Sequence, residues 1–413
     1  MGTAFSTALS ALNADSTAIN VVGNNLANLN TTGFKASEVD FSNLMAEQIG
    51  TGSGNGQVGL GVGQITAIQN FSQGSINTTN GALDAAIQGN GFFVVKDSTN
   101  NQLYTRDGSF QLNSTGVLTT ATGEFVQGWT ATNGQVNTNG ATGNITVPVG
   151  STIAPNATTT MSMSVNLNSA TAVNGTYSSP IQVYDSLGAA HTLTVTYTET
   201  AAGSWGYTVT VPAADLKSGG NATVATGTLT FDSNGNLTSP AAGAPIPVAI
   251  KGLADGATDM SINWNVYNSA GTPEMTQYAQ ASALSNPQQD GYAAGQVSKV
   301  SIQNGGLVVA DYTNGQQVTL GQLAIASIAN PTSLLQVGDN NLQASAATAQ
   351  AALGAAGTGG NGSVQGGALE ASTTDMAGEF THLLSYERSY QAASRIITTS
   401  DQLTQETVNL IHS

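Results

Sequence analysis

Apolar residues recur at helical spacing near the beginning of this 413-residue chain. No proline interrupts the segment from Thr3 to Leu29, and its large apolar side chains follow a heptad pattern, which indicates an amphipathic helix. Gly33 stands where a glycine that ends a helix is expected. The apolar stripe of this predicted helix comprises Phe5, Leu9, Leu12, Ile19, Leu26 and Leu29.

A longer stripe of the same kind occupies the end of the sequence. Ser372 and Asp375 predict its start, because they match a capping box. A helix of about 40 residues would be about 60 Å long, which is too long for the core of a compact domain. The apolar positions of this predicted helix are Met376, Phe380, Leu383, Tyr390, Ile396, Ile397, Leu403, Leu410 and Ile411.

Between the two ends the pattern is that of β-strands. Apolar and polar residues alternate with a period of two in 193–197, 207–211 and 262–266. Asn-Gly and Asp-Gly pairs between such segments signal tight turns. The chain is therefore predicted to be mixed but mainly β, with antiparallel sandwich-like or barrel-like domains and long terminal helices that pair as a coiled coil.

The apolar stripes of the terminal helices need partners. The two helices can cover each other within one chain, as a hairpin stalk, but such a pair leaves much of each stripe in water. Alternatively, the stripes are buried between subunits. If one surface meets a different surface of the next copy, the contact generates an open helical filament.

Composition excludes several classes of protein. Eight Lys and Arg residues against 24 Asp and Glu give a net charge of −16, which is too few cations to neutralise many phosphates or to bind an anionic membrane. No apolar run is long enough for a transmembrane helix, and the start lacks the positive region of a cleaved secretory signal. We therefore expect neither nucleic-acid binding nor membrane insertion. Cysteine is absent, which excludes disulfides and thiolate ligands.

Candidate chemistry is sparse, and we expect no enzyme activity, cofactor or metal site. His191, His382 and His412 show no ligand spacing, and His191 is expected to be an ordinary surface or turn residue. The glycine-rich run at 50–63 lacks the Lys-Ser/Thr of a phosphate loop, so it is expected to be a flexible connector. The Asp/Asn/Gly cluster at 232–236 is explained by turn chemistry rather than by calcium binding.

Four segments resemble the bacterial flagellar rod and hook proteins. They are residues 24–35, 83–95, 104–110 and 386–395, which cover both ends and the first β block. The motif positions in the two terminal segments are Asn24, Asn28, Thr31, Gly33, Phe34, Lys35, Arg388, Tyr390, Gln391 and Ala392. Residues 184–188 and 231–237 are similar to the middle domain of the hook members, and the length of the insertion favours these over the shorter rod members.

The resemblance implies a structural subunit of a curved, flexible tube that transmits torque from rod to filament and encloses an export channel. It implies an inner domain formed by 1–35 and 370–413, a glycine-rich connector at 36–69, a discontinuous β domain at 70–150 and 276–365, and an inserted outer β domain at 151–275. Arg388 and Arg395 are then candidates for ion pairs between subunits, or they belong to a solvated face or the channel lining.

The resemblance also implies partners and a location. The partners are other copies of the chain, the distal rod protein, the hook cap protein, the hook–filament junction protein, the hook-length control protein and the flagellar type III export apparatus. The expected location is extracellular, in the flagellar hook, after export without a cleaved signal peptide. Two alternatives stay open, namely a distal rod subunit with an unusual insertion and an extracellular adhesin with a helical stalk.

Overall fold

The computed structural model describes residues 2–44, 47–48 and 57–412 and divides into two compact units. The helix–β unit comprises Met1–Val149, Lys299–Ala310 and Gln317–Ser413, and the insert unit comprises Gly150–Ser298 and Asp311–Gln316. Mainly β structure with two terminal helices in contact confirms the predicted fold class. Among the described residues, no helix combines the length and apolarity needed to cross a membrane. The division into four predicted domains stays a prediction.

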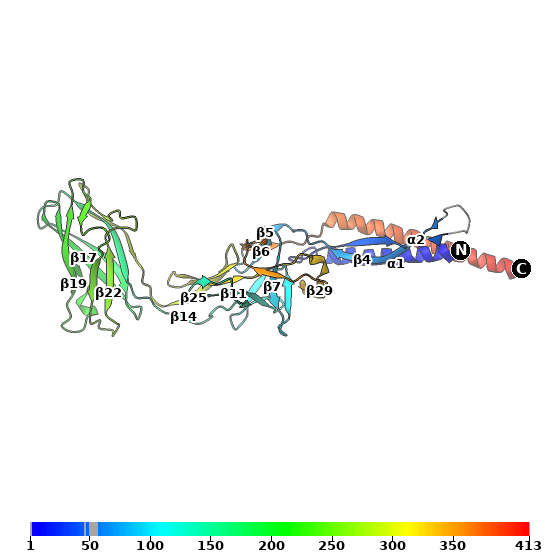
Figure 1. The fold of residues 1–413 in the computed structure, drawn as a ribbon, viewed down its shortest axis with the longest axis horizontal. Helices are drawn as coiled ribbons and strands as arrows, with labels where there is room; N and C mark the ends of the chain where they lie inside the picture. The colour runs from blue at the N-terminus through cyan, green and yellow to red at the C-terminus, as the bar shows by residue number, and fades with distance from the viewer. Residues whose placement is uncertain (1, 45–46, 49–56, 413) are drawn as a thin grey trace. The chain divides into compact units, whose positions relative to one another are not determined.

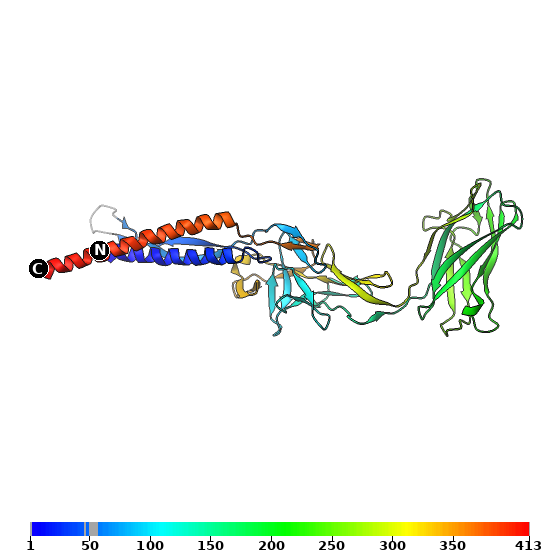
Figure 2. The ribbon, with the colours of Figure 1, turned by 180° about the vertical axis from the view of Figure 1, so that it is seen from behind.

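The terminal helices are α1 (Gly2–Ala27) and α2 (Met376–His412), which lie side by side and antiparallel in the helix–β unit (Figures 1 and 2). The predicted capping box is wrong in its first residue. The helix-capping side chain is Asp375, whose carboxylate accepts the N–H groups of Ala377 at 3.1 Å and Gly378 at 3.2 Å. A carboxylate is favoured at this place because it satisfies free amides at the positive end of the helix dipole.

A hairpin lies within the predicted glycine-rich connector at 36–69. Strands β1 (Ser37–Asn43) and β4 (Val62–Gln69) pair antiparallel and contact α1, and the short β2 (Glu47–Gln48) and β3 (Gln57–Val58) pair with each other. Residues 49–56, which hold part of the glycine-rich run, lie outside the described residues. Paired strands on both sides of that run mean that the connector is not irregular throughout.

The β part of the helix–β unit is built on one branched sheet. Its main path is β26-β27-β11-β7-β8-β30-β29, and its core includes Phe93, Leu118 and Ile325, all fully buried. The strands of this sheet are β7 (Phe92–Lys96), β8 (Gln102–Thr105), β9 (Phe110–Leu112), β10 (Leu118–Thr120), β11 (Phe125–Thr132), β12 (Gln135–Val136), β13 (Gly143–Asn144), β25 (Gly295–Ile302), β26 (Leu307–Tyr312), β27 (Gln317–Leu323), β28 (Ile325–Ser327), β29 (Leu335–Gly338), β30 (Asn341–Gln343) and β31 (Ala352–Gly354). Two separate pairs are formed by β5 (Ile76–Thr78) with β33 (Ala368–Glu370) and by β6 (Ala85–Gln88) with β32 (Ser363–Gly366).

The insert unit is a sandwich of two five-stranded sheets. One has the order β16-β17-β18-β19-β20, and the other has the order β21-β22-β15-β23 with β24 also on β15. The strands of the sandwich are β15 (Thr160–Asn168), β16 (Thr176–Tyr184), β17 (Ala190–Ala201), β18 (Ser204–Thr210), β19 (Thr223–Phe231), β20 (Leu237–Ser239), β21 (Ile246–Ile250), β22 (Met260–Asn265), β23 (Met275–Tyr278) and β24 (Ala283–Gln289). The short β14 (Thr152–Ile153) lies outside the sandwich and pairs with β25.

Two features of this sandwich differ from the expected pattern. The second sheet is mixed, because β15 runs parallel to β22 and β23 and antiparallel to β24. Strand β23, which begins at residue 275 where the predicted insertion ends, and strand β24, which lies beyond it, complete that same sheet. Sequence alternation reports which face of a strand is buried, but it carries no information on which strand lies beside which.

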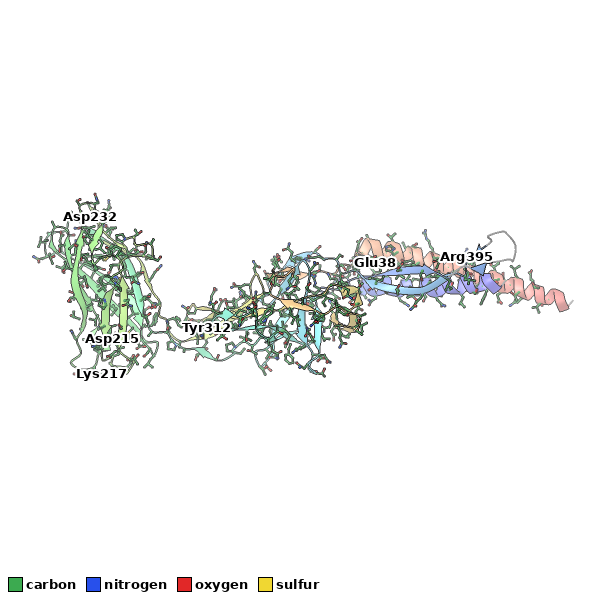
Figure 3. All side chains as sticks on the ribbon, viewed as in Figure 1. Glu38, Asp215, Lys217, Asp232, Tyr312 and Arg395 are labelled. Atoms are coloured by element: carbon green, nitrogen blue, oxygen red, sulfur yellow. The ribbon has the colours of Figure 1, made fainter. Side chains whose placement is uncertain are left out.

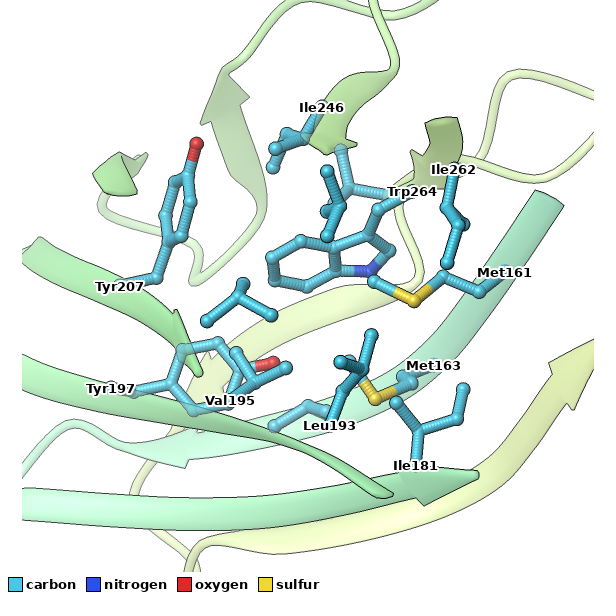
Figure 4. Close-up of a cluster of buried hydrophobic side chains, with 14 of the residues drawn as sticks. Met161, Met163, Ile181, Leu193, Val195, Tyr197, Tyr207, Ile246, Ile262 and Trp264 are labelled. Carbon is cyan, nitrogen blue, oxygen red and sulfur yellow. The ribbon is translucent and has the colours of Figure 1, made fainter. Parts of the chain in front are cut away.

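Alternating side chains of the two sheets form the core of the insert unit. Leu193, Val195 and Tyr197 of β17 are fully buried, as their period-two pattern predicts. They meet Trp264 of the facing sheet, and the rings of Tyr207 and Trp264 make an edge-to-face contact at 5.4 Å (Figure 4). Such geometry favours aromatic pairs beyond the area that they bury.

The prediction that His191 is an ordinary surface or turn residue is wrong. His191 is buried, with Nδ1 2.9 Å from Oδ2 of Asp215 and Nε2 3.1 Å from Oδ2 of Asp185. The physical reason is its position, since residues 191, 193, 195 and 197 share the inward face of β17. Extending the alternation by one more step would have placed this histidine inside.

The turn interpretation of residues 232–236 is confirmed. Oδ1 of Asp232 accepts the N–H groups of Asn234 and Asn236, and Gly235 has a φ of +79°. Asp185 makes the same two bonds to Leu187 and Ala189. The Oδ1 atom of each aspartate is therefore satisfied by its own turn.

Candidate functional site

Small side chains form the buried face of α1. Ala8, Ala18 and Val22 are buried against α2 and the β1–β4 hairpin, and Ala393 is buried on α2. Small residues allow two helices to approach closely, because the distance between helix axes depends on the side chains at the contact. The two helices therefore pack on each other without using most of their large apolar residues.

The predicted apolar stripes are only partly buried within the chain. Nine large side chains on the described parts of the two helices are between 41% and 55% exposed, and they are Phe5, Leu9, Met376, Phe380, Leu384, Tyr390, Ile396, Leu403 and Val408. The remaining predicted positions are half-buried, and they are Leu12, Ile19, Leu26, Leu29, Leu383 and Ile397. Leu410 and Ile411 have side chains outside the described residues. We call the nine exposed side chains the apolar rows. Sequence reasoning missed Leu384, which lies four residues after Phe380 on the same face.

The end of α2 extends past the beginning of α1. The helices have 37 and 26 residues, and the C-terminal turns of α2 continue beyond the N-terminus of α1 in both views (Figures 1 and 2). Every described side chain from 401 to 409 is exposed. This overhang, which includes Leu403, has little in its own chain to pack on.

The motif at the end of α1 closes the helix and starts the hairpin. The Asn28 amide donates to the Asn24 carbonyl at 2.9 Å, and the Thr31 hydroxyl donates to Oδ1 of Asn28 at 3.0 Å. These bonds satisfy groups at a helix C-terminus that have no partner within the helix. Sequence reasoning placed Asn24, Asn28 and Thr31 in the motif, and the structure brings them together.

Asn25, which the predicted site omitted, joins three segments. This fully buried side chain accepts the Ser37 N–H at 3.0 Å and donates to the Ser37 carbonyl at 2.8 Å. It also donates to Oε1 of Glu379 on α2 at 2.8 Å. The Asn25 side chain thus ties α1 to the hairpin and to α2. Its signal in the sequence is a polar residue at a buried position of the helical repeat, between Val22 and Leu29.

A buried ion triad lies where the terminal segments meet the β strands. Glu370 is fully buried, and its carboxylate is 2.6 Å from Nζ of Lys35 and 3.0 Å from a guanidinium nitrogen of Arg106. The Gly74 N–H donates to the same carboxylate at 2.8 Å, and Arg106 also donates to the Gly89 carbonyl at 2.7 Å. Burial lowers the pKa of Lys35, and the hydrogen bond and charge of Glu370 act in the opposite direction.

The triad connects three distant parts of the sequence. Lys35 ends the N-terminal motif, Arg106 follows β8, and Glu370 ends β33 just before α2. Sequence reasoning identified Lys35 but missed Arg106 and Glu370 as its partners, since no local pattern links residues 264 and 335 positions apart. Phe34 is buried beside Lys35, and its carbonyl accepts the Thr373 N–H at 3.1 Å.

The remaining motif residues lie on the exposed face of α2. Arg388, Gln391 and Ala392 are exposed, and Gln391 donates to Oε1 of Glu387 at 3.2 Å. Among the described residues, neither Arg388 nor Arg395 takes part in an ion pair within the chain. These cations are therefore accessible to another molecule.

Gly33 is required by its backbone and by its surroundings. Its φ is +67°, and a Cβ there would lie 2.6 Å from the carbonyl carbon of Arg106. We expect Gly33→Ala to lower the free energy of unfolding of the helix–β unit by about 1–3 kcal/mol. Hydrogen exchange of strands β5 and β33 measured in increasing urea would report the change.

Gly23 offers a matched control in α1. A Cβ at Gly23 meets nothing within 4 Å, so Gly23→Ala is expected to stabilise the helix by about 1 kcal/mol. Equal effects of the two substitutions on exchange would contradict the role assigned to Gly33.

Four family models match successive parts of the chain. They are the "Flagella basal body rod protein" at residues 5–35, the "Flagellar hook protein FlgE/F/G D1 domain" at 86–168, the "Flagellar basal body protein FlaE D2 domain" at 156–292 and the "Flagellar basal body rod FlgEFG protein C-terminal" at 365–410. Together they span most of both terminal helices, the first β strands of the helix–β unit and most of the insert unit.

Full-length relatives agree with these matches. The flagellar hook protein FlgE of Salmonella typhimurium is 35% identical, with 98% of this chain and 99% of the relative covered, and that of Escherichia coli is 34% identical, with 98% and 100% covered. The crystal structure of the Helicobacter pylori flagellar hook protein FlgE2 aligns with a TM-score of 0.49 at 14% identity, over 65% of this chain and 93% of that one. By its full-length identity to the Salmonella typhimurium and Escherichia coli relatives, the chain belongs to the flagellar hook protein FlgE family, a non-enzymatic family of structural proteins of the hook, an extracellular part of the flagellum.

Proposed function

We propose that the chain polymerises through its terminal helices into a curved, flexible tube, which transmits torque from rod to filament and encloses the export channel. The observation that carries this proposal is that α1 and α2 already pack on each other through small side chains, while the apolar rows stay exposed. A monomeric protein rarely leaves large apolar patches in water, so such patches mark interaction surfaces.

The form of the apolar rows supports an open polymer. The row on α1 and the row on α2 are different surfaces of one chain, and a contact between different surfaces repeats indefinitely when its rotation does not close. The overhang of α2 adds a segment that a second copy can cover. The inner helical domain, formed by 1–35 and 370–413, then makes the contacts that hold the tube.

Torque transmission requires that the helices do not move independently of the β strands. The Asn25 contacts and the ion triad tie α1, the hairpin and the start of α2 to the strands of the helix–β unit. Flexibility would come from polar contacts between the insert units of neighbouring copies. These contacts would be weaker than the contacts between helices, so an insert unit would change its neighbours more readily. Bulky substitutions near 232–236 are then expected to alter the curvature of the tube before they abolish assembly.

The specific partners belong to the same proposal. The ends of such a tube would contact the distal rod protein and the hook–filament junction protein, and growth would involve the hook cap protein, the hook-length control protein and the type III export apparatus. Support for these partners rests on membership of the family, whose matched models include rod proteins as well as hook proteins.

The apolar rows can be tested directly by substitution. In Phe380→Ser/Ile396→Ser/Leu403→Ser, each change removes a large side chain that would be buried on assembly. Each half-exposed side chain contributes about 1 kcal/mol to the free energy of assembly when it becomes buried. Removal of all three is therefore expected to raise the protein concentration needed for assembly at least about 100-fold. Electron microscopy after concentration would show tubes for the wild-type chain only, and circular dichroism would show that the helices persist.

A control with three substitutions at exposed polar positions of α2, Ser385→Ala/Ser389→Ala/Gln405→Ala, is expected to form tubes as the wild type does. Tubes from the serine variant at the wild-type concentration would refute the proposed interface. Straight, rigid tubes from the wild type would favour a rod subunit. A discrete wild-type oligomer that binds a surface ligand would favour an adhesin with a helical stalk.

A further inference from the structure

A cluster of one histidine and three aspartates lies at one end of the insert unit and has no part in the proposed assembly. It is built from the turn after β16, the start of β17, the short helical turn η1 (Ala213–Asp215) and the loop before β22. Figure 3 shows Asp215 and Lys217 at this end of the unit and Asp232 at the opposite end. His191 and Asp185 are buried, and Asp255 is exposed at the rim.

The imidazole of His191 is held in a defined orientation. Its Nδ1 lies 2.9 Å from Oδ2 of Asp215, a carboxylate that accepts a proton carried on Nδ1. Its Nε2 lies 3.1 Å from Oδ2 of Asp185, so a proton on Nε2 would bond to that carboxylate, and a metal ion that binds Nε2 would take the place of this proton. A carboxylate behind one imidazole nitrogen is the usual arrangement around a histidine that binds a metal through its other nitrogen.

The carboxylates make the cluster strongly anionic. Ligand atoms of Asp185, His191 and Asp255 all lie within 4.8 Å of one another. Oδ1 of Asp185 already accepts two backbone N–H groups, so Oδ2 is the atom that faces Nε2 of the imidazole. Two carboxylates at this separation repel each other unless a proton or a cation lies between them. Among the described residues, Lys217 forms no ion pair with any of the three aspartates.

We propose that Asp185, His191 and Asp255 bind a divalent transition-metal ion, with Zn²⁺ the best match. The ligands would be Nε2 of His191, Oδ2 of Asp185 and the Asp255 carboxylate, with Asp215 orienting the imidazole. One imidazole nitrogen and two carboxylate oxygens suit Zn²⁺ better than Ca²⁺ or Mg²⁺, which favour all-oxygen sites. The 3.1 Å from Nε2 to Oδ2 is close to the separation of about 3.3 Å between ligand atoms of a tetrahedral zinc ion.

The loops that carry the ligands are already fixed to one another. The Thr258 N–H donates to the Ser186 hydroxyl at 3.1 Å, which joins the Asp255 loop to the Asp185 turn. The Ala254 N–H donates to the Asp215 carbonyl at 2.9 Å, which joins the same loop to η1. Only the exposed Asp255 side chain has to adjust on binding. The ion would cross-link three loops and stabilise the insert unit.

The test uses the full-length chain, freed of metal with a chelator and then equilibrated with Zn²⁺, Ca²⁺ or Mg²⁺. We expect one tightly bound Zn²⁺ per chain by elemental analysis after dialysis. We also expect the Tm of the insert unit to rise by about 5 °C, as a saturating ligand that binds only the folded state requires. Tryptophan fluorescence can follow this transition, because Trp205 and Trp264 both lie in the core of the insert unit. Ca²⁺ and Mg²⁺ are expected to give shifts at least several-fold smaller.

Two substitutions in one exposed loop provide the matched comparison. Asp255→Asn removes a proposed ligand from the rim and is expected to abolish both Zn²⁺ retention and the Tm shift, while the Tm of the metal-free variant stays near that of the wild type. Asp259→Asn changes an exposed carboxylate that is not one of the three ligands, and it keeps the oxygen that accepts the Gly252 N–H at 2.9 Å. It is expected to behave as the wild type does. No Zn²⁺ retention by the wild type, or equal retention by wild type and Asp255→Asn, would overturn the proposal.

Discussion

Glu370→Gln is expected to lower the free energy of unfolding of the helix–β unit by about 3–5 kcal/mol. The substitution keeps the shape of the side chain but removes the single negative charge that faces Lys35 and Arg106, and all three residues are buried. Breaking a buried ion pair by removing one partner leaves an uncompensated charge in a medium of low polarity, which is where the large cost arises. Hydrogen exchange of β5, β6 and β33 in increasing urea would measure the loss.

Two further variants make this prediction specific. Glu406→Gln removes a charge from the exposed overhang of α2 and is expected to change stability by less than about 0.5 kcal/mol. The double variant Lys35→Met/Glu370→Gln removes one of the two stranded cations, so it should be more stable than Glu370→Gln alone. A Glu370→Gln chain with wild-type exchange would show that the triad contributes nothing to the junction.

Trp264→Ala is expected to destabilise the insert unit by about 3–5 kcal/mol and to leave the terminal helices unchanged. Trp264 is fully buried between the two sheets, where its ring meets those of Tyr207 at 5.4 Å and Tyr197 at 6.4 Å. Truncating a tryptophan in such a core loses its transfer free energy and leaves a cavity that rigid strands cannot fill. Exchange of β17 and β22 should accelerate, while exchange of α1 and α2 serves as an internal reference.

Val173→Ala is the control in the same unit, because Val173 is 57% exposed and its truncation opens no cavity. Its expected effect is below about 0.5 kcal/mol. If Trp264→Ala also accelerated exchange in the terminal helices, the two units would not be independent in stability.

Predictions from the sequence succeeded where the physical cause is local. The heptad spacing of α1 and α2 and the period-two alternation of β17 follow from the geometry of single elements, which place residues three or four apart, or two apart, on one face. The five-residue turn that begins at Asp232 is local in the same sense, because its side chain closes its own backbone.

Sequence patterns could also show which positions of the terminal helices are apolar, but not which of them the chain buries itself. The structure buries Ala8, Ala18 and Val22 and leaves Phe5 and Leu9 exposed, since two helices can pair along more than one face of their stripes. That choice matters for function, because it leaves the large side chains free for another subunit.

The sequence by itself determined the mainly β architecture, the two terminal helices and, through its motifs, the family. Only the tertiary structure decided that Lys35 and Arg106 share Glu370, that Asn25 joins α1 to the hairpin and to α2, and that His191 lies among aspartates. The physical reason is that the partners lie on different elements, and their polar and charged atoms interact only after these elements have been brought within a few ångströms in a buried, weakly polar environment.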